Sequence, residues 1–359
     1  MSLSTVSDPR IARKKQCMSS FAVRLIRWQR RQGRHDLPWQ HQDVYRVWLS
    51  EIMLQQTQVV TVIPYYLRFV ASFPSIAALA AATEEEILTH WSGLGYYARG
   101  RNLHKAARII VREFGGEFPR RFEDIIELPG VGRSTAAAIC ALAYHECRAI
   151  LDGNVKRVLA RHAGIDGWPG DKRVEGNLWQ QAEALFPSHE VAAYTQALMD
   201  LGATLCTRSK PRCFNCPVQG DCVAFSTNRT GELPASRPRK SIPEHQVIML
   251  LVTHDNDILL EKRPSTGIWG GLWSLPQFDD ELAAKSWFMR NALIASEGER
   301  MKMFSHSFTH FRLHISPLKI QLAHKPSQHP RSGSIWLDMK EASGAAIPVP
   351  VRKILNDLD

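Results

Sequence analysis

The spacing at which apolar residues recur changes once along the chain, and this change limits the folds that the chain can adopt. Beyond residue 245 apolar residues alternate, which predicts strands over 246–254, 257–262, 304–307, 311–320 and 334–337, with helices near 281–295 and 352–358. Before residue 205 they recur at three-to-four spacing, which predicts amphipathic helices over 21–30, 45–54, 97–114, 134–144 and 192–205. The chain therefore predicts an all-α part followed by an α+β part.

The apolar residues of the segment between the two parts have no regular spacing. Residues 226–243 read STNRTGELPASRPRKSIP and carry three prolines and a basic cluster, a composition typical of a linker. We therefore predict a helical domain over 1–225, a linker over 226–244 and a second domain over 245–359. A chain of 359 residues also exceeds the size of about 250–300 residues at which single hydrophobic cores stop growing.

Positive charge is concentrated in the helical part. Of the net charge of +10, residues 1–230 contribute 29 − 21 = +8 and residues 231–359 contribute 16 − 14 = +2. Such a surface favours a polyanionic partner, because each neutralised phosphate releases counterions.

The longest apolar run, residues 136–143, is far shorter than the roughly 20 residues of a membrane-spanning helix. Residues 1–17 resemble neither a secretory signal nor an anchor. We expect a cytoplasmic protein without a membrane partner.

Four of the seven cysteines form a cluster with the spacing Cys206-x6-Cys213-x2-Cys216-x5-Cys222. Disulfides have little use in a reducing compartment, so the four thiols are expected to be metal ligands. Four thiolates suit either tetrahedral zinc or an iron–sulfur cluster. Zinc ribbons usually pair two Cys-x2-Cys knuckles and this sequence has one, but the residues alone leave both metals open.

A glycine turn between two predicted helices forms a candidate phosphate site. Residues 124–136 read DIIELPGVGRSTA, in which Pro129 cannot continue a helix, Gly130 and Gly132 permit positive φ, and a new helix begins near Ser134. Such a turn leaves backbone amides free to bind a DNA phosphate.

Asp152 lies twenty residues beyond the turn, where a further helix can open at Asn154. It is either an ordinary helix N-cap or a buried carboxylate with a task near bound DNA.

Together these motifs resemble one family. Residues 50–58 (SEIMLQQTQ), 93–99 (GLGYYAR) and 151–158 (LDGNVKRV), with the turn and the cysteines, are similar to the helix-hairpin-helix DNA glycosylases of the endonuclease III superfamily, and within it to the adenine DNA glycosylases of the MutY family. The resemblance implies an all-α glycosylase domain with an iron–sulfur cluster loop and an α+β Nudix-like domain after it. It also implies a [4Fe–4S] cluster on Cys206, Cys213, Cys216 and Cys222 that supports DNA binding, and a bacterial-type monomer associated with the nucleoid while it acts.

The implied reaction is removal of adenine mispaired with 8-oxoguanine or guanine in double-stranded DNA. Glu51, flanked by apolar residues on a helix, is the expected general acid at adenine N7, with its pKa raised. Asp152, beside a helix N-terminus, is expected to stay charged and to stabilise or transiently capture C1′ of the sugar. Relatives that also cut the strand carry a lysine where this chain has Ser134, so the resemblance implies a monofunctional glycosylase. Lyase activity, another base preference and DNA binding without catalysis are the alternatives.

Base contacts are implied only by the resemblance. The target base must leave the helical stack, and Gln55, one helical turn from Glu51, is expected to read an adenine edge. The resemblance places further residues at the duplex: Gln56 and Tyr96 as wedges, Thr57 and Leu94 against the opposite base, and Trp39 and Gln196 in the adenine pocket.

The second domain resembles a Nudix fold that has lost its chemistry. Residues 267–277 (GIWGGLWSLPQ) are similar to the entry of that fold, but the metal-binding box Arg-Glu-x2-Glu-Glu-x-Gly is absent from the sequence. The resemblance therefore implies a silent domain that contacts 8-oxoguanine. The family's Phe-Ser-His loop stands here as Phe308, Thr309 and His310, a departure that adds a methyl group.

Overall fold

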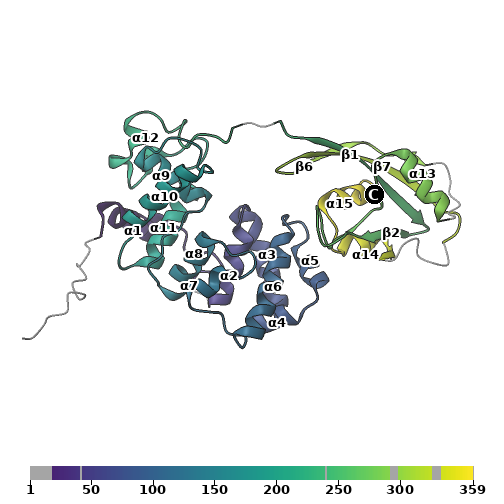
Figure 1. Cartoon of the computed structure of the whole chain (residues 1–359), viewed down its shortest axis with the longest axis horizontal. Coiled ribbons are helices and arrows are strands. Elements are labelled where there is room, and N and C mark those ends of the chain that lie inside the picture. Colours follow the sequence, from purple (N-terminus) through teal and green to yellow (C-terminus); the bar gives the residue numbers. More distant parts are fainter. Residues whose placement is uncertain (1–17, 41–42, 239–240, 292–297, 326–332, 359) are drawn as a thin grey trace, which may run out of the picture. The chain divides into compact units, whose positions relative to one another are not determined.

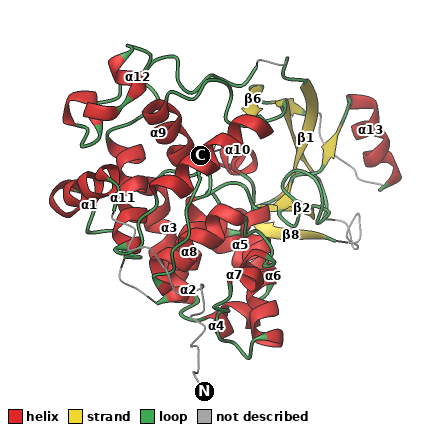
Figure 2. Ribbon diagram, turned by 60° about the vertical axis from the view of Figure 1, so that its left-hand side comes forward, coloured by secondary structure: helices red, strands yellow, loops and turns green. Residues whose placement is uncertain are grey.

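The computed structural model describes residues 18–40, 43–238, 241–291, 298–325 and 333–358. Helices make up the chain before residue 227, and the strands begin at residue 244 (Figures 1 and 2). This order confirms the expected all-α part followed by an α+β part. The predicted end of one helix, residues 292–295, lies outside the described residues. No helix in the described ranges is long and apolar enough to cross a membrane.

The helical part contains twelve α-helices and two short 3-10 helices within its described residues. Their bounds are α1 Ser20–Gln32, α2 Val44–Leu54, α3 Val59–Ser72, α4 Ile76–Ala81, α5 Glu84–Trp91, α6 Ala98–Glu113, α7 Phe122–Ile126, α8 Arg133–Tyr144, α9 Gly153–Ala163, α10 Lys172–Leu185, α11 Val191–Thr204, η1 Cys213–Asn215, η2 Gln219–Asp221 and α12 Val223–Ser226.

Local sequence signals define many of the helix ends. Thr83 and Glu86 form a capping box at the start of α5, with each side chain bonded to the other residue's backbone N–H. The N-caps of α9 and α10 are Asp152 and Asp171, whose carboxylates accept hydrogen bonds from the first amides of their helices. Gly164 ends α9 in the left-handed conformation, with φ of +67°.

One hydrophobic core joins α1, α9, α10 and α11. Leu25 of α1, Leu159 of α9, Leu178 of α10 and Leu198 of α11 are all buried in it. The three-to-four spacing of the apolar residues places each of these side chains on the inner face of its helix. This core therefore supports α9, whose first turn carries Asp152.

The second part is built on a mixed sheet with the strand order β3-β2-β1-β7-β5. The long strands β1 and β7 are parallel, and the pairs β1–β2, β6–β7 and β2–β8 are antiparallel. The strand bounds are β1 Glu244–His254, β2 Asp257–Lys262, β3 Trp273–Ser274, β4 Gln277–Phe278, β5 Glu299–Arg300, β6 Phe304–Ser307, β7 Arg312–Gln321 and β8 Ser334–Asp338.

Helices cover both faces of this sheet. In the middle of β1 consecutive residues are buried, and because side chains alternate between the two faces, both faces must be covered. Helix α13 (Glu281–Arg290) packs on β1 and β4, with Trp287 beside Leu250 and Val252. Helix α14 (Met339–Gly344) packs on β2, β8 and α15 (Val349–Asn356). Hence this part has its own core.

The described residues separate into two compact units that do not follow chain order. One unit contains residues 1–55 and 117–238, and the other contains residues 56–116 and 239–359. Part of the predicted linker belongs to the first unit, because Leu233 is buried and its carbonyl accepts a hydrogen bond from Arg161. The division into 1–225, 226–244 and 245–359 stays a prediction about which segments fold independently.

Candidate active site

Glu51 lies in the third turn of α2, in an apolar setting. Its helix neighbours Ile52 and Met53 are fully buried, and Ser50 is buried as well. Burial raises the pKa of Glu51 to about 8, and the charge of Asp152 adds to the rise. The carboxyl group therefore keeps its proton at neutral pH, as a general acid requires.

Asp152 caps α9 and is also part of this site. One of its oxygens, Oδ1, accepts hydrogen bonds from the N–H groups of Asn154 at 2.6 Å and Val155 at 2.9 Å. Burial raises the pKa of Asp152, and this effect outweighs the two amide bonds and the charges of Arg157 and Lys156, which lower it. The helix N-terminus does favour the charged form of Asp152, as expected, but desolvation is the larger effect on its pKa.

The two carboxyl groups are electrostatically coupled. The negative charge of Asp152 contributes to the raised pKa of Glu51, so a proton on Glu51 and a charge on Asp152 stabilise each other. The amide bonds and the two basic residues at the start of α9 partly offset burial at Asp152 and favour its ionised form, whereas both causes of the shift at Glu51 raise its pKa. The pair thus provides a proton donor next to a carboxylate.

The glycine turn connects both acidic residues. Gly130 has φ of +82°, as expected. Gly132 does not use the freedom of its missing side chain: it is the N-cap of α8 with φ of −99°. No side chain among the described residues caps α8, which leaves its first amides open to an anion. A Cβ at Gly132 would meet nothing within 4 Å, and this open space suits a phosphate.

Three hydrogen bonds connect the turn and the start of α8 to the segments that carry the acids. Gln55, directly after α2, donates from Nε2 to the carbonyl of Gly130 at 3.1 Å and to Oγ1 of Thr135 at 3.3 Å. The hydroxyl of Ser134 accepts from the N–H of Leu151 at 2.9 Å, next to Asp152. The amide of Gln55 therefore has a structural task in this structure, and its reading of an adenine edge stays a prediction.

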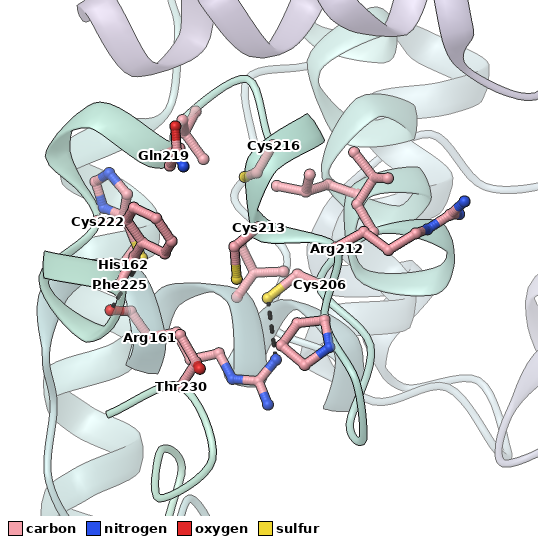
Figure 3. Close-up of a pocket in the computed structure, with 15 residues that line it drawn as sticks. Arg161, His162, Cys206, Arg212, Cys213, Cys216, Gln219, Cys222, Phe225 and Thr230 are labelled. Atoms are coloured by element: carbon pink, nitrogen blue, oxygen red, sulfur yellow. Dashed lines mark hydrogen bonds between the residues drawn. The ribbon is translucent and has the colours of Figure 1, made fainter. Parts of the chain in front are cut away.

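The four clustered cysteines line one small pocket (Figure 3). Arg161, from α9, donates from Nη1 to Sγ of Cys206 at 3.4 Å, and the thiol of Cys222 donates to the carbonyl of Arg161 at 3.6 Å. Arg157, one turn earlier, donates from Nε to the carbonyl of Cys206 at 2.8 Å. Helix α9 therefore contacts the pocket along its length and carries Asp152 at its start.

The chemistry of this pocket fits a metal centre. Burial and the neighbouring sulfurs raise the pKa of the Cys213, Cys216 and Cys222 thiols, to about 12 for Cys216. A group of thiols in such a place is stabilised as thiolates only by bound cations, whose binding releases the protons. The fit lies in the chemistry of the thiols and not in their positions, since within the described ranges no set of three or more His, Cys, Asp or Glu side chains has the arrangement of a metal site.

Comparison with known proteins agrees with this geometry. The chain is 38% identical over 339 residues to a protein named adenine DNA glycosylase from Buchnera aphidicola subsp. Acyrthosiphon pisum (strain APS), and the match covers 94% of this chain and 97% of that protein. It is 32% identical to a protein of the same name from Homo sapiens, over 98% of this chain and 76% of that one. The chain belongs to the adenine DNA glycosylase family.

Two domain models match within this member of the adenine DNA glycosylase family. Residues 49–184 match the HhH-GPD superfamily of base excision DNA repair proteins, and residues 247–357 match a NUDIX domain. The expected fold class, a helix-hairpin-helix glycosylase domain followed by a Nudix-like domain, is confirmed, and so is the expectation of a base excision repair enzyme.

Solved structures show the same fold in the helical part. A thermostable thymine-DNA glycosylase is 29% identical, with a TM-score of 0.53 over 58% of this chain and 95% of that one. An endonuclease III solved in a non-covalent DNA complex is 21% identical, with a TM-score of 0.50 over 58% of this chain and 94% of that one, and this likeness shows the fold alone.

The two residues expected as wedges in an adenine DNA glycosylase have unusual backbones. Gln56 is exposed with φ of +56°, and Tyr96 is 46% exposed with φ of +50°. Non-glycine residues rarely adopt positive φ, and such strain tends to occur at functional positions. Their insertion into a duplex stays a prediction.

The other expected base contacts are less exposed. Thr57 accepts a hydrogen bond from Arg99, whereas Leu94 and Trp39 are 5% and 6% exposed. Gln196 donates from Nε2 to Oδ1 of Asp200 at 2.8 Å. The roles of these four side chains at bound DNA stay predictions.

The loop expected to read 8-oxoguanine forms the turn between β6 and β7. The ring of Phe308 stacks on that of Phe311, with the centroids 4.5 Å apart, and also contacts Trp269 at 5.5 Å. Thr309 and His310 are exposed. The aromatic contacts therefore hold the base of the loop and leave two polar side chains at its tip.

Sequence reasoning missed three residues of the site. Arg99 is a buried guanidinium, Asp200 is a fully buried carboxylate that pairs with Arg34 at 2.7 Å, and Thr135 bonds Gln55. Arg99 belongs to a motif that the sequence analysis singled out, and its charge inside that apolar segment was the available signal. The contacts of Asp200 and Thr135 depend on residues distant in sequence, and no local pattern indicates them.

Proposed function

We propose that the protein is a monofunctional glycosylase that hydrolyses the N-glycosidic bond of adenine mispaired with 8-oxoguanine or guanine in double-stranded DNA. The observation that carries this proposal is the Glu51–Asp152 pair, in which burial and the charge of Asp152 raise the pKa of Glu51 to about 8 while two backbone amides hold the carboxylate of Asp152. Membership of the adenine DNA glycosylase family supports the choice of base.

The two carboxyl groups divide the reaction between them. Glu51 gives its proton to N7 of the flipped adenine, so the electron pair of the C1′–N9 bond can leave with a neutral base. The sugar becomes an oxocarbenium-like cation, which the carboxylate of Asp152 stabilises at C1′ until water adds and loses a proton. The bonds of Asp152 to Asn154 and Val155 fix the position of this carboxylate.

The glycine turn supplies the grip on the DNA backbone. The uncapped amides at the start of α8 and the open space at Gly132 support binding of a phosphate. Because Gln55 and Ser134 connect this turn to the segments that carry Glu51 and Asp152, a phosphate bound there would position the sugar at the two acids. This contact is independent of base sequence.

Two observations favour hydrolysis without strand cleavage. Ser134, at the position of the lyase lysine, is engaged by the N–H of Leu151. Lys156, which follows Asp152 on α9, pairs with Glu175 at 2.6 Å. A paired ammonium is a poor nucleophile, since attack requires the free amine.

We propose further that Cys206, Cys213, Cys216 and Cys222 hold a [4Fe–4S] cluster. Their common pocket, their partial burial and the N–H of Arg161 that donates to Cys206 support this ligand set. A bound cluster would hold the loop of residues 206–222 in shape and support DNA binding, and the excision reaction itself uses only the side chains described above.

Single-turnover excision from a panel of defined duplexes tests the proposal. We expect release of free adenine opposite 8-oxoguanine and, more slowly, opposite guanine, with no strand nick before alkali treatment. Release of another base in preference to adenine would contradict the choice of base. Nicking without alkali would contradict the monofunctional reaction.

A further inference from the structure

Two loops with strained, exposed residues meet at one buried arginine. The loop between α2 and α3 contains Gln56 and Thr57, and the loop between α5 and α6 contains Leu94, Gly95 and Tyr96. Each loop has one exposed non-glycine residue with positive φ, namely Gln56 and Tyr96. Such conformations persist only where the surrounding structure holds them. Gln56 and Tyr96 therefore need a group that fixes their loops.

Arg99 contacts both loops. It lies in the first turn of α6 and is 8% exposed. Its Nη2 donates to Oγ1 of Thr57 at 3.0 Å, to the carbonyl of Gly95 at 3.2 Å and to the carbonyl of Leu94 at 3.5 Å. One guanidinium nitrogen thus connects the two loops.

Aromatic rings complete the surroundings of this guanidinium. Its Cζ lies 5.3 Å from the centroid of the Tyr96 ring and 5.6 Å from that of Trp91, within the range of cation–π attraction. Trp91 also donates from Nε1 to the carbonyl of Gly95 at 3.2 Å. Burial lowers the pKa of Arg99 to about 10, so the group remains charged at neutral pH.

We propose that Arg99 is a positioning residue that fixes Gln56 and Tyr96 in the conformation that enters the DNA duplex. This inference rests on the proposed function, because base extrusion is the step that a wedge assists. Arg99 itself does not touch the reacting atoms. This role needs both the charge and the planar fork of the guanidinium, which contacts the rings of Tyr96 and Trp91. A lysine would therefore be an incomplete substitute.

Base extrusion can be measured apart from excision. We would place 2-aminopurine, whose fluorescence rises when it leaves the stack, at the target position opposite guanine, and use the full chain carrying Glu51→Gln. The variants Arg99→Met and Arg99→Lys would be added to this background. Arg112→Met is the matched control, since Arg112 is on the same helix and its side chain is 70% exposed. Circular dichroism would check folding.

The expected result separates positioning from general damage. Arg99→Met should abolish most of the fluorescence rise while the DNA dissociation constant changes by less than about threefold, because phosphate contacts supply most of the affinity. With Glu51 restored, it should slow single-turnover excision about 10- to 100-fold, as small misplacements do. Arg99→Lys should be intermediate, and Arg112→Met should match its background.

Each other outcome overturns the inference. A full fluorescence rise with Arg99→Met, or equal losses of affinity and extrusion, would show that Arg99 does not position the wedge. If Arg99→Met fails to fold, Thr57→Val removes one acceptor without removing the buried charge, and it must then reduce extrusion more than affinity. A parent protein that neither extrudes 2-aminopurine nor excises adenine would instead refute the proposed function.

Discussion

The charge of Asp152 reinforces the rise that burial produces in the pKa of Glu51, which reaches about 8. A carboxyl group whose pKa is higher in the folded than in the unfolded protein binds its proton more tightly when folded. The stability that it contributes is therefore present at low pH and is lost as the pH rises from the unfolded value of 4.5 to about 8. The environment that keeps Glu51 protonated therefore lowers the stability of the folded protein at neutral pH.

Replacement of Glu51 by Gln tests the role of this carboxyl group in excision and its effect on stability. Excision of adenine should fall by about 10² to 10⁴, because the amide has no proton to give, while DNA binding should remain within about threefold, since phosphate contacts supply most of the affinity. Single-turnover kinetics and a binding titration measure the two quantities.

The thermal midpoint gives an independent reading of the same variant. The difference in Tm between Glu51→Gln and the parent should become more favourable to the variant as the pH increases from 5 to 9. Glu113→Gln, an exposed substitution on α6, is the control and should change neither excision nor Tm. Excision by Glu51→Gln at the parental rate would remove Glu51 from the mechanism.

The pH dependence of excision follows from the same pKa. Because the proposed mechanism uses the protonated form of Glu51, the single-turnover rate should decrease about tenfold per pH unit above pH 8. Asp152 must be ionised, so the rate should also decrease at low pH and the profile should be bell-shaped. A rate that stays flat from pH 7 to pH 10 would contradict the assignment of Glu51 as the acid.

Asp152 combines a cap with a proposed catalytic charge, and the chain offers a matched control. Asp171 caps α10 through bonds to Arg173 and Val174, as Asp152 caps α9. Asn is an equally good N-cap, so Asp152→Asn and Asp171→Asn should both keep the parental Tm within about 2 °C. Asp152→Asn alone should lose excision, by at least about 10²-fold. Equal excision by the two variants would leave Asp152 with the capping role alone.

Much of the fold could be predicted from local patterns. The turn at Asp255-Asn256 and the apolar alternation after it define β2 at Asp257–Lys262, as the sequence predicted. The short strands β3, β4 and β5 have two residues each, and no period is measurable over two residues. Helix α10 was missed because polar residues break its apolar spacing, although Asp171 marks its start.

The candidate site shows the same limit. Glu51 and Asp152 could be proposed from the sequence because their chemistry and their motifs are local. The electrostatic balance at Asp152 was not predictable, since the burial that raises its pKa depends on how distant helices pack. The engagement of Gln55 with Gly130 and Thr135 likewise depends on the meeting of α2 and α8.

The cysteine cluster makes a prediction about metal content. Protein purified without air or chelators should contain about four iron atoms per chain and show the yellow-brown colour of a [4Fe–4S] cluster. Cys213→Ser should lower the iron content and DNA binding. Cys147→Ser should alter neither, since Cys147 is exposed and donates to the carbonyl of Ser188. Stoichiometric zinc in place of iron would refute the cluster.

The tip of the β6–β7 turn should carry part of the preference for 8-oxoguanine. Thr309 and His310 are exposed there, whereas Phe308 is held by Phe311 and Trp269. Replacing both polar residues by Ala in the full chain should therefore leave the domain folded. Excision opposite guanine should stay within about twofold of the parent. Excision opposite 8-oxoguanine should fall about tenfold, the effect of losing one or two hydrogen bonds of about 1 kcal/mol each.

The ratio of the two rates decides this prediction, because a general loss of activity would lower both equally. His324→Ala, an exposed substitution in the same domain, should leave the ratio unchanged. Phe308→Leu should give a smaller change than the double variant if Phe308 acts by holding the loop through its aromatic contacts. An unchanged ratio in the double variant would place recognition of the damaged base elsewhere in the chain.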